Sequence, residues 1–190
     1  MTQEIEIEFK NLLEKEEYDY LLKNIPFPTE GKLQINHYFE TSNFSLKEQG
    51  CALRIREKHG KYTLTLKEPH PDGLLETHDL LTKQEALSWI NGTIIPKYNT
   101  SKQLLQKDIQ LEKLVYCGSL STLRREVSDQ GVLLVLDYST YNDQADYELE
   151  VEANSQKEGL RIFHQLLEEN KIKERATPNK IERFFHSLEN

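Results

Sequence analysis

The segment Glu4-Ile5-Glu6-Ile7-Glu8-Phe9-Lys10 alternates charged and apolar residues, and it constrains the fold more than any other part of this chain. Read as a β-strand, it places three carboxylates and an ammonium group on one face and three apolar side chains on the other. Neighbouring carboxylates on that face lie about 6.6 Å apart and repel by about 2.5 kcal/mol at an effective dielectric constant of about 20. In an enclosed space the row therefore requires cations, either bound metal ions or basic side chains from elsewhere in the chain.

The composition is typical of one globular domain spanning residues 1–190. Hydrophobic residues make up 37% of the chain and charged residues 29%, which fits a single buried core. No apolar run approaches the length of about 20 residues that crosses a membrane. Acidic residues stand where a signal peptide has its basic and apolar segments. We therefore expect a cytoplasmic protein with no membrane partner.

Cysteine, histidine and net charge exclude several classes of protein. Cys51 and Cys117 are too few for a disulfide framework and lie in apolar, strand-like settings, so we expect two buried free thiols. The six histidines lack the paired spacing of a zinc site. A net charge of -8 argues against nucleic acid as the main partner. It still allows a local basic pocket for a small anion.

Two groups of strands dominate the pattern. The first comprises residues 32–41, 51–58, 61–68 and 74–80, with hairpin turns at 59–60 and 71–73. The second comprises residues 114–116, 119–128, 132–139 and 146–153, with a hairpin loop at 129–131. The sequence thus predicts an α+β fold that is mainly antiparallel β. One closed or nearly closed sheet with helices packed outside accommodates all of these segments.

Helices are predicted between and after the strands. The first is a short helix that ends at Pro26 and Pro28. Its apolar positions recur at roughly helical spacing, at Leu12, Leu13, Leu21, Leu22 and Ile25. Thr82 caps a helix over residues 82–91 with Glu85 three residues on, and the polar stretch 99–110 is compatible with another. Ser155 caps a later helix, and Pro178 precedes the last one.

Charged rows recur on several of the predicted strands. Carboxylates alternate with apolar residues at Glu148, Glu150 and Glu152, and Asp137 ends another apolar strand. Basic residues gather on other elements, at Arg54, Arg56, Lys67, Arg124, Arg125 and Lys180. Any one row fits a half-exposed strand that binds nothing. Their repetition favours a shared interior, in which basic side chains match phosphate oxygens and carboxylates hold Mg²⁺ or Mn²⁺.

These rows resemble the CYTH superfamily, also called triphosphate tunnel metalloenzymes. Its hallmark is Glu-x-Glu-x-Lys near the N-terminus, here Glu6-Ile7-Glu8-Phe9-Lys10. The resemblance spans almost the whole chain and is greatest to the small single-domain bacterial members. It also rests on residues 36–41, 50–56, 65–67, 136–137 and 178–180 and on the Glu-x-Glu pair near residue 150. Glu40 stands where many members have aspartate, and we expect a structural role for it.

The resemblance implies a closed eight-stranded antiparallel barrel that forms a tunnel for a triphosphate. It assigns triphosphate binding to Lys10, Arg54, Arg56, Lys67, Arg125 and Lys180, with Arg124 as the competitor of Arg125, because adjacent strand residues face opposite ways. It assigns Mg²⁺ or Mn²⁺ to Glu6, Glu8, Asp137, Glu150 and Glu152, and Glu4 and Glu148 extend these acidic rows.

The activity that the resemblance implies is metal-dependent hydrolysis of inorganic triphosphate or a small organic or nucleoside triphosphate. Lys10 and one of Glu150 and Glu152 are the catalytic candidates, the glutamate as acceptor of a proton from water. Two alternatives stay open: cyclisation of ATP to cyclic AMP, and a non-catalytic module that binds triphosphate. The chain is expected to act on a small molecule as a monomer or a homodimer.

Overall fold

The computed structural model describes residues 2–188, and the fold of that part of the chain is built on eight strands. These are β1 (Gln3–Leu13), β2 (Lys32–Thr41), β3 (Ala52–Lys58), β4 (Lys61–His70), β5 (Gly73–Leu81), β6 (Leu114–Asp129), β7 (Val132–Tyr141) and β8 (Gln144–Ala153). The helices are α1 (Lys15–Asn24), α2 (Ser45–Glu48), α3 (Lys83–Ile90), α4 (Tyr98–Gln106), the 3₁₀ helix η1 (Leu111–Lys113), α5 (Gln156–Glu169) and α6 (Lys180–Leu188).

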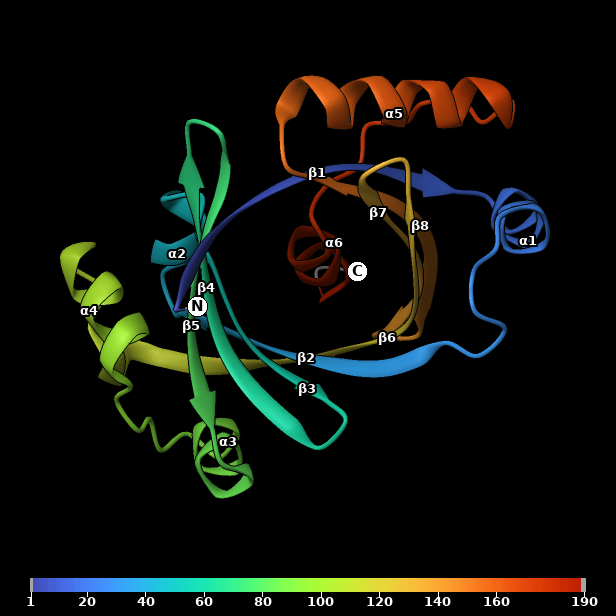
Figure 1. The fold of residues 1–190 in the computed structure, drawn as a ribbon. Coiled ribbons are helices and arrows are strands. Elements are labelled where there is room, and N and C mark those ends of the chain that lie inside the picture. The colour runs from blue at the N-terminus through green and yellow to red at the C-terminus, as the bar shows by residue number, and fades with distance from the viewer. Residues whose placement is uncertain (1, 189–190) are drawn as a thin grey trace. The chain divides into compact units, whose positions relative to one another are not determined.

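Hydrogen-bonded neighbours follow the order β1-β5-β4-β3-β2-β6-β7-β8, and the sheet closes into a barrel (Figure 1). The predicted class, mainly antiparallel β with a closed eight-stranded barrel, is confirmed. Two compact units divide the described residues, the first comprising residues 2–5 and 34–120 and the second residues 6–33 and 121–188. Each unit is described by itself below.

The first unit is an antiparallel meander with helices on its apolar face. The β3–β4 hairpin turns at His59 and Gly60, both with positive φ (53° and 70°), as a two-residue turn of this kind requires. Alternate residues of β3 and β4, including Leu53, Ile55, Leu64 and Leu66, form a core with Trp89 of α3 and Leu104 of α4. The opposite face of the same strands therefore carries their polar side chains.

The second unit repeats this division between an apolar and a charged face. Leu149 and Val151 of β8 pack with Ile162 and Phe163 of α5, and Leu21 of α1 belongs to the same core. The β6–β7 hairpin turns at Gln130 and Gly131, again with positive φ (48° and 82°). Asp137, Glu148 and Glu150 occupy the other face of β7 and β8, where they contact the first turn of α6. The sequence had already placed Lys180, in the first turn of α6, among the charged residues of the shared interior.

Several predicted boundaries were wrong. Leu12 and Leu13 belong to β1, because this strand pairs with β8 as far as Leu13. β6 runs continuously from Leu114 to Asp129 where two separate segments were expected. Helix α2 was not predicted. It is held by Glu40, whose carboxylate accepts hydrogen bonds from the backbone N–H groups of Leu46 (3.0 Å) and Lys47 (2.9 Å), which agrees with the structural role expected for Glu40.

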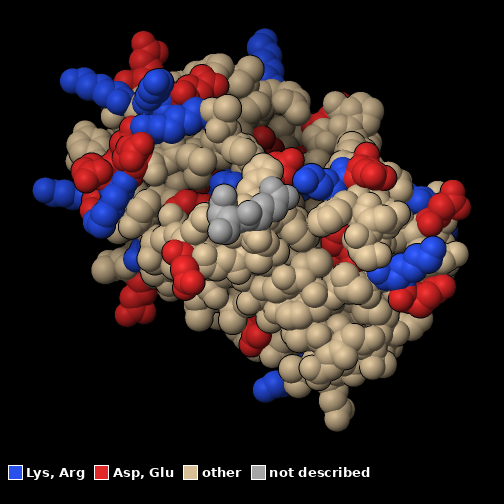
Figure 2. Space-filling model, turned by 180° about the vertical axis from the view of Figure 1, so that it is seen from behind, with Lys and Arg blue, Asp and Glu red and all other residues tan. Residues whose placement is uncertain are grey.

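The predicted caps of two helices are confirmed. Thr82 and Glu85 form the predicted capping box of α3, and the Ser155 hydroxyl accepts a hydrogen bond from the backbone N–H of Glu158 at the start of α5. Both cysteines are free thiols, although Cys117 is only partly buried. Among the residues described, none of the helices has the length and apolar character needed to span a bilayer. On the face that Figure 2 shows, the described basic side chains are intermixed with acidic ones.

Candidate functional site

The second unit gathers most of the predicted site residues into an acidic cluster, which we define as Asp137, Glu148 and Glu150 with Arg124 and Lys180. Strand register brings these residues together: Asp137 lies opposite Arg124 on β6 and opposite Glu148 on β8. The three acidic side chains are almost fully buried, with residue exposures of 0%, 0% and 4%. Burying them at this density requires cations at hydrogen-bonding distance.

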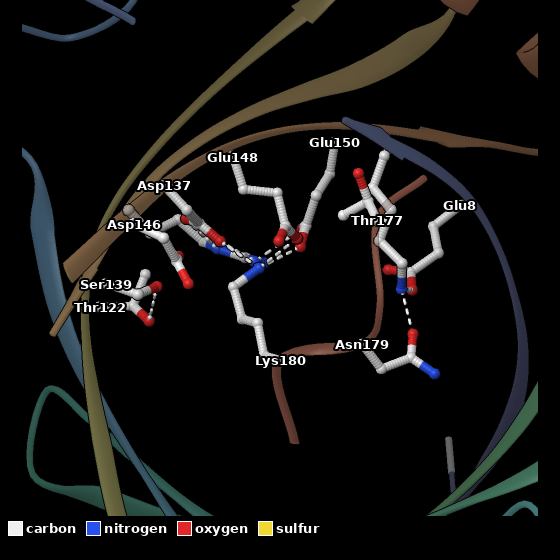
Figure 3. A network of polar contacts seen from close by, with 12 residues as sticks. Glu8, Thr122, Asp137, Ser139, Asp146, Glu148, Glu150, Thr177, Asn179 and Lys180 are labelled. Carbon is white, nitrogen blue, oxygen red and sulfur yellow. Dashed lines mark hydrogen bonds and ion pairs between the residues drawn. The ribbon is translucent and has the colours of Figure 1, made fainter. Parts of the chain in front are cut away.

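Lys180 supplies one of these cations from the first turn of α6. Its Nζ lies 3.0 Å from Asp137 Oδ2 and 2.6 Å from Glu148 Oε1, and it also contacts Glu150 Oε1. Figure 3 shows the lysine side chain directed at these three carboxylates. Burial works to lower the pKa of Lys180, but the surrounding carboxylates outweigh it and hold that pKa well above its ordinary value.

Arg124 supplies the second cation and decides between the two predicted arginines. Its guanidinium donates from Nε to Asp137 Oδ1 (2.9 Å) and from Nη2 to Glu150 Oε2 (2.7 Å). Arg125 faces the other side of β6, where it donates to the Tyr18 hydroxyl (2.7 Å) and the Thr29 carbonyl (3.2 Å). The prediction that preferred Arg125 is therefore corrected: Arg124 joins the carboxylates, because side chains alternate along a strand.

Two side chains beside the acidic cluster were missed by sequence reasoning. Arg183, one turn after Lys180 on α6, pairs with Asp146 (2.9 Å) and Glu148 (2.5 Å). Asp146 continues the alternation of Glu148 and Glu150 and could have been read as part of the same row. Arg183 carried no comparable signal, because its role depends on where α6 begins in space.

The acidic residues of β1 and β8 meet at one register position. Glu8 lies directly opposite Glu152, and Lys10 lies opposite Glu150. Lys10 donates to Glu8 Oε1 (2.8 Å) and to Asn179 Oδ1. Burial first, and then the negative charge of Glu150, raise the pKa of Glu152 to about 7, and Glu6 and Glu8 add to this shift. The Glu152 carboxylate is thus short of compensating positive charge.

The pKa of Glu150 differs sharply from those of the other two carboxylates of β8, Glu148 and Glu152. Burial raises the pKa of Glu148 to about 7 despite the nearby Lys180. Burial also opposes ionisation of Glu150, but Arg124 and Lys180 outweigh it and hold its pKa well below the usual range. Only Glu150, which contacts both cations, has its pKa lowered against the effect of burial.

The first unit holds a separate basic cluster, which we define as Arg54, Arg56 and Lys67 with Glu76 and His78. Arg56 donates from Nε to Asn36 Oδ1 (3.1 Å). Lys67 Nζ lies 2.5 Å from Glu76 Oε1, and Arg54 Nη2 lies 3.7 Å from the same oxygen. Glu4, which was expected to extend the metal-binding row, lies in this unit and accepts from His78 Nε2 (3.1 Å). Glu76 and His78 were missed, although they alternate on β5 as the other charged rows do.

The described strands form a closed barrel, and charged side chains of both signs alternate along them. Comparison with known proteins identifies the family that has this fold. A family model described as the CYTH domain matches residues 4–185. This chain belongs to the CYTH family, and the predicted family is confirmed.

Individual relatives cover nearly the full chain. A Bacillus subtilis (strain 168) protein named "Putative triphosphatase YjbK" is 44% identical over 186 residues, 97% of this chain and 96% of that protein. A Bacillus halodurans structure described as "a putative adenylate cyclase" is 43% identical, with a TM-score of 0.94 over 97% of this chain and 100% of that one. The Hippeastrum protein HpAC1, described as having a dominant triphosphatase activity, shares the fold at 23% identity and a TM-score of 0.77, with 96% of each chain covered.

Proposed function

We propose that this protein hydrolyses a triphosphate, either inorganic triphosphate or a small organic or nucleoside triphosphate, with the help of Mg²⁺ or Mn²⁺. The observation that carries the proposal is the direct opposition of Glu8 and Glu152 on paired strands. Like charges placed opposite each other destabilise a sheet. The name of the B. subtilis relative, which is 44% identical, supports the same activity.

The donor set fits a hard divalent cation. Asp137, Glu148 and Glu150 each contact a side-chain cation at 2.6–2.7 Å, whereas the Arg124 guanidinium lies 3.7 Å from Glu152. We therefore narrow the proposed metal-binding set to Glu6, Glu8 and Glu152, whose oxygens suit Mg²⁺ or Mn²⁺. Such a metal, when bound, would neutralise phosphate charge and lower the pKa of a coordinated water.

The remaining charged residues take two roles in this proposal. Lys10, Arg54, Arg56 and Lys67 bind phosphate oxygens, for which ammonium and guanidinium groups are well suited. Arg124 and Lys180 hold the buried carboxylates of the acidic cluster in place and keep Glu150 ionised. Of the two predicted proton acceptors, Glu150 is the poorer, because Arg124 and Lys180 hold its pKa low. Glu152 keeps that role.

Cyclisation of ATP is the second candidate, favoured by the description of the B. halodurans structure at 43% identity. The charged residues required are the same, because both reactions stabilise negative charge on a triphosphate. They differ in products: hydrolysis releases orthophosphate or pyrophosphate with a shortened phosphate chain, whereas cyclisation releases cyclic AMP and pyrophosphate.

The test is a substrate panel of tripolyphosphate, ATP and thiamine triphosphate with Mg²⁺, Mn²⁺ or EDTA, and chromatography of the products. We expect phosphate release that requires metal and is lost in the Glu6→Gln/Glu8→Gln variant, while circular dichroism shows that the variant remains folded. Cyclic AMP as the main product would establish the second candidate instead. Stabilisation of the protein against heat by triphosphate and metal, without any turnover, would contradict both and indicate a binding module.

A further inference from the structure

We propose that His78 is a positioning residue that, through Glu76, sets the place of the Lys67 ammonium group for binding a phosphate oxygen. This inference rests on the proposed function, because it assigns Lys67 to the triphosphate. His78 itself contacts neither Lys67 nor, in this proposal, the substrate.

The chain of contacts lies entirely within the first unit. Strand register places His78 opposite Thr65 and Glu76 opposite Lys67. His78 Nε2 lies 3.3 Å from Glu76 Oε2 and 3.1 Å from Glu4 Oε1, and the other Glu76 oxygen, Oε1, lies 2.5 Å from Lys67 Nζ. Glu76 is 5% exposed. One buried carboxylate thus connects the imidazole to the ammonium group.

The partners of the imidazole fix its role as a donor. Nε2 faces two carboxylate oxygens, which only accept, so Nε2 carries a hydrogen. It donates to Glu4 Oε1 (3.1 Å) and lies at ion-pair distance from Glu76 Oε2 (3.3 Å). Nδ1 lies 3.0 Å from the Thr65 hydroxyl, which holds the ring from its other side. Thr65 is 3% exposed, so this contact is shielded from water. The ring is held at both nitrogens, and its orientation determines that of the Glu76 carboxylate.

Lys67 needs this support because its charge sits on a flexible four-carbon stem. A lysine that is already ordered loses less side-chain freedom when it binds an anion. Glu76 also lies near Arg54, whose Nη2 is 3.7 Å from Oε1. Loss of the His78 contact removes one constraint on the Glu76 carboxylate, and the position of the Lys67 ammonium group becomes less fixed.

The experiment compares His78→Leu, His78→Gln, Lys67→Met and the double variant His78→Leu/Lys67→Met on the triphosphate that wild type hydrolyses. We expect His78→Leu to raise KM about tenfold with little change in kcat, the size expected when a polar contact with a charged group is lost. His78→Gln retains a donor and should stay within about threefold of wild type. Because His78 acts through Lys67, His78→Leu should have almost no effect in the Lys67→Met background.

His164→Leu is the matched control, because His164 also lies near a carboxylate (Glu174, 3.6 Å) but on an exposed helix surface. Its KM should equal that of wild type. A His78→Leu variant that melts earlier yet keeps the wild-type KM would overturn the proposal and leave His78 a purely structural residue. Equal effects of His78→Leu with and without Lys67 would overturn it as well.

Calorimetry with tripolyphosphate in EDTA separates this inference from the proposed function. If wild type binds tripolyphosphate but does not hydrolyse it, the proposed function fails. In that case, weaker binding of tripolyphosphate by His78→Leu than by wild type still supports the positioning role of His78. Absence of binding by wild type would overturn both. The ligand atoms of Glu4, Glu76 and His78 lie within 4.8 Å of one another. Stabilisation by Mn²⁺ that His78→Leu loses and Glu6→Gln/Glu8→Gln keeps would identify a metal site and overturn the positioning role.

Discussion

At the scale of single residues, this protein shows how neighbouring carboxylates on one strand acquire different chemistry. Glu150 contacts both Arg124 and Lys180, whereas the only cation near Glu152 is the Arg124 Nη1, at 3.7 Å, among the ion pairs described here. Their pKa values move in opposite directions, well below the usual range for Glu150 and to about 7 for Glu152. Access to a cation, more than burial alone, separates the two.

The raised pKa of Glu152 predicts a pH-dependent stability of the metal-free protein. Between its unfolded value of 4.5 and its folded value of about 7, the folded state binds more protons, so stability falls as pH rises through this range. The shift corresponds to at most about 3 kcal/mol. Glu152→Gln should therefore unfold at a higher urea concentration than wild type at pH 8 in EDTA, with a free energy of unfolding greater by about 1–3 kcal/mol. At pH 4 the two proteins should have the same stability.

Glu112→Gln, at an exposed position, serves as the control and should follow the wild-type curve at both pH values. Some pH dependence will remain in Glu152→Gln because Glu148 has a similarly raised pKa. If the free energy of unfolding of Glu152→Gln changed between pH 4 and pH 8 as much as that of wild type, ionisation of Glu152 would not destabilise the protein.

The two neighbouring arginines should differ in their contribution to stability and activity. Arg124→Met leaves the fully buried Asp137 without its guanidinium partner and should cost about 3–5 kcal/mol in chemical denaturation. Arg125→Met loses contacts to Tyr18 and Thr29 on the other face, about 1–2 kcal/mol, and should hydrolyse triphosphate at the wild-type rate. A greater loss of activity in Arg125→Met would restore the original assignment.

At the scale of elements, the segment between α5 and α6 determines where Lys180 lies. The Asn11 side chain of β1 accepts from the Arg175 N–H (2.6 Å) and donates to the Lys173 carbonyl (3.0 Å). The Thr177 hydroxyl accepts from the Leu12 N–H (2.9 Å). These contacts attach residues 173–177 to the end of β1, and α6 begins three residues later. The acidic cluster therefore depends on a connection that has no secondary structure of its own.

Helix α5 packs so closely on the sheet that it tolerates no side chain at Gly159. An added Cβ would lie 2.6 Å from Phe9 Cε2 and 2.7 Å from Ala153 Cβ. Alanine gains about 1 kcal/mol in helix propensity, and overpacking costs about 1–3 kcal/mol. Because both distances lie far inside normal contact, the clash should prevail, and Gly159→Ala should be less stable by about 1–2 kcal/mol in urea denaturation.

Lys157→Ala, at an exposed position of the same helix, controls for propensity and should not destabilise the protein. Phe9→Leu in the Gly159→Ala background should recover part of the loss, because the two sites are in contact. A more stable Gly159→Ala variant would mean that α5 can shift away from β1 at little cost.

Local signals explain which elements the sequence could predict. Hairpins at His59-Gly60 and at residues 129–131 and the caps at Thr82 and Ser155 follow from neighbouring residues, and all were predicted. Helix α2 depends on Glu40, which lies five residues before it on another element, so no local pattern indicated it. Alternation likewise predicted that charged residues share a face, but could not choose between Arg124 and Arg125 or predict the partners of Lys180.

At the scale of the whole molecule, three strands belong to both compact units. β1 changes unit after Ile5, β2 after Leu33 and β6 after Leu120. Each unit has its own hydrophobic core. Continuous strands shared by two cores favour cooperative unfolding, which accords with our proposal that residues 1–190 form one domain.

Trp89 offers a direct test of that cooperativity. It is the only tryptophan of the chain and is fully buried in the core of the first unit. Its fluorescence therefore reports on that unit, whereas far-UV circular dichroism reports on both. We expect the two urea transitions to coincide. Separate midpoints would show that the units unfold independently and would contradict the single-domain proposal.

The order of synthesis gives the Lys180 contacts a further consequence. The ribosome makes Glu150 thirty residues before the lysine that neutralises it. Until that lysine arrives, a dehydrated β8 would hold ionised carboxylates without one of their cations. The nascent chain should therefore keep this strand hydrated. The barrel should close late, when Lys180 in the first turn of α6 contacts the carboxylates of the acidic cluster.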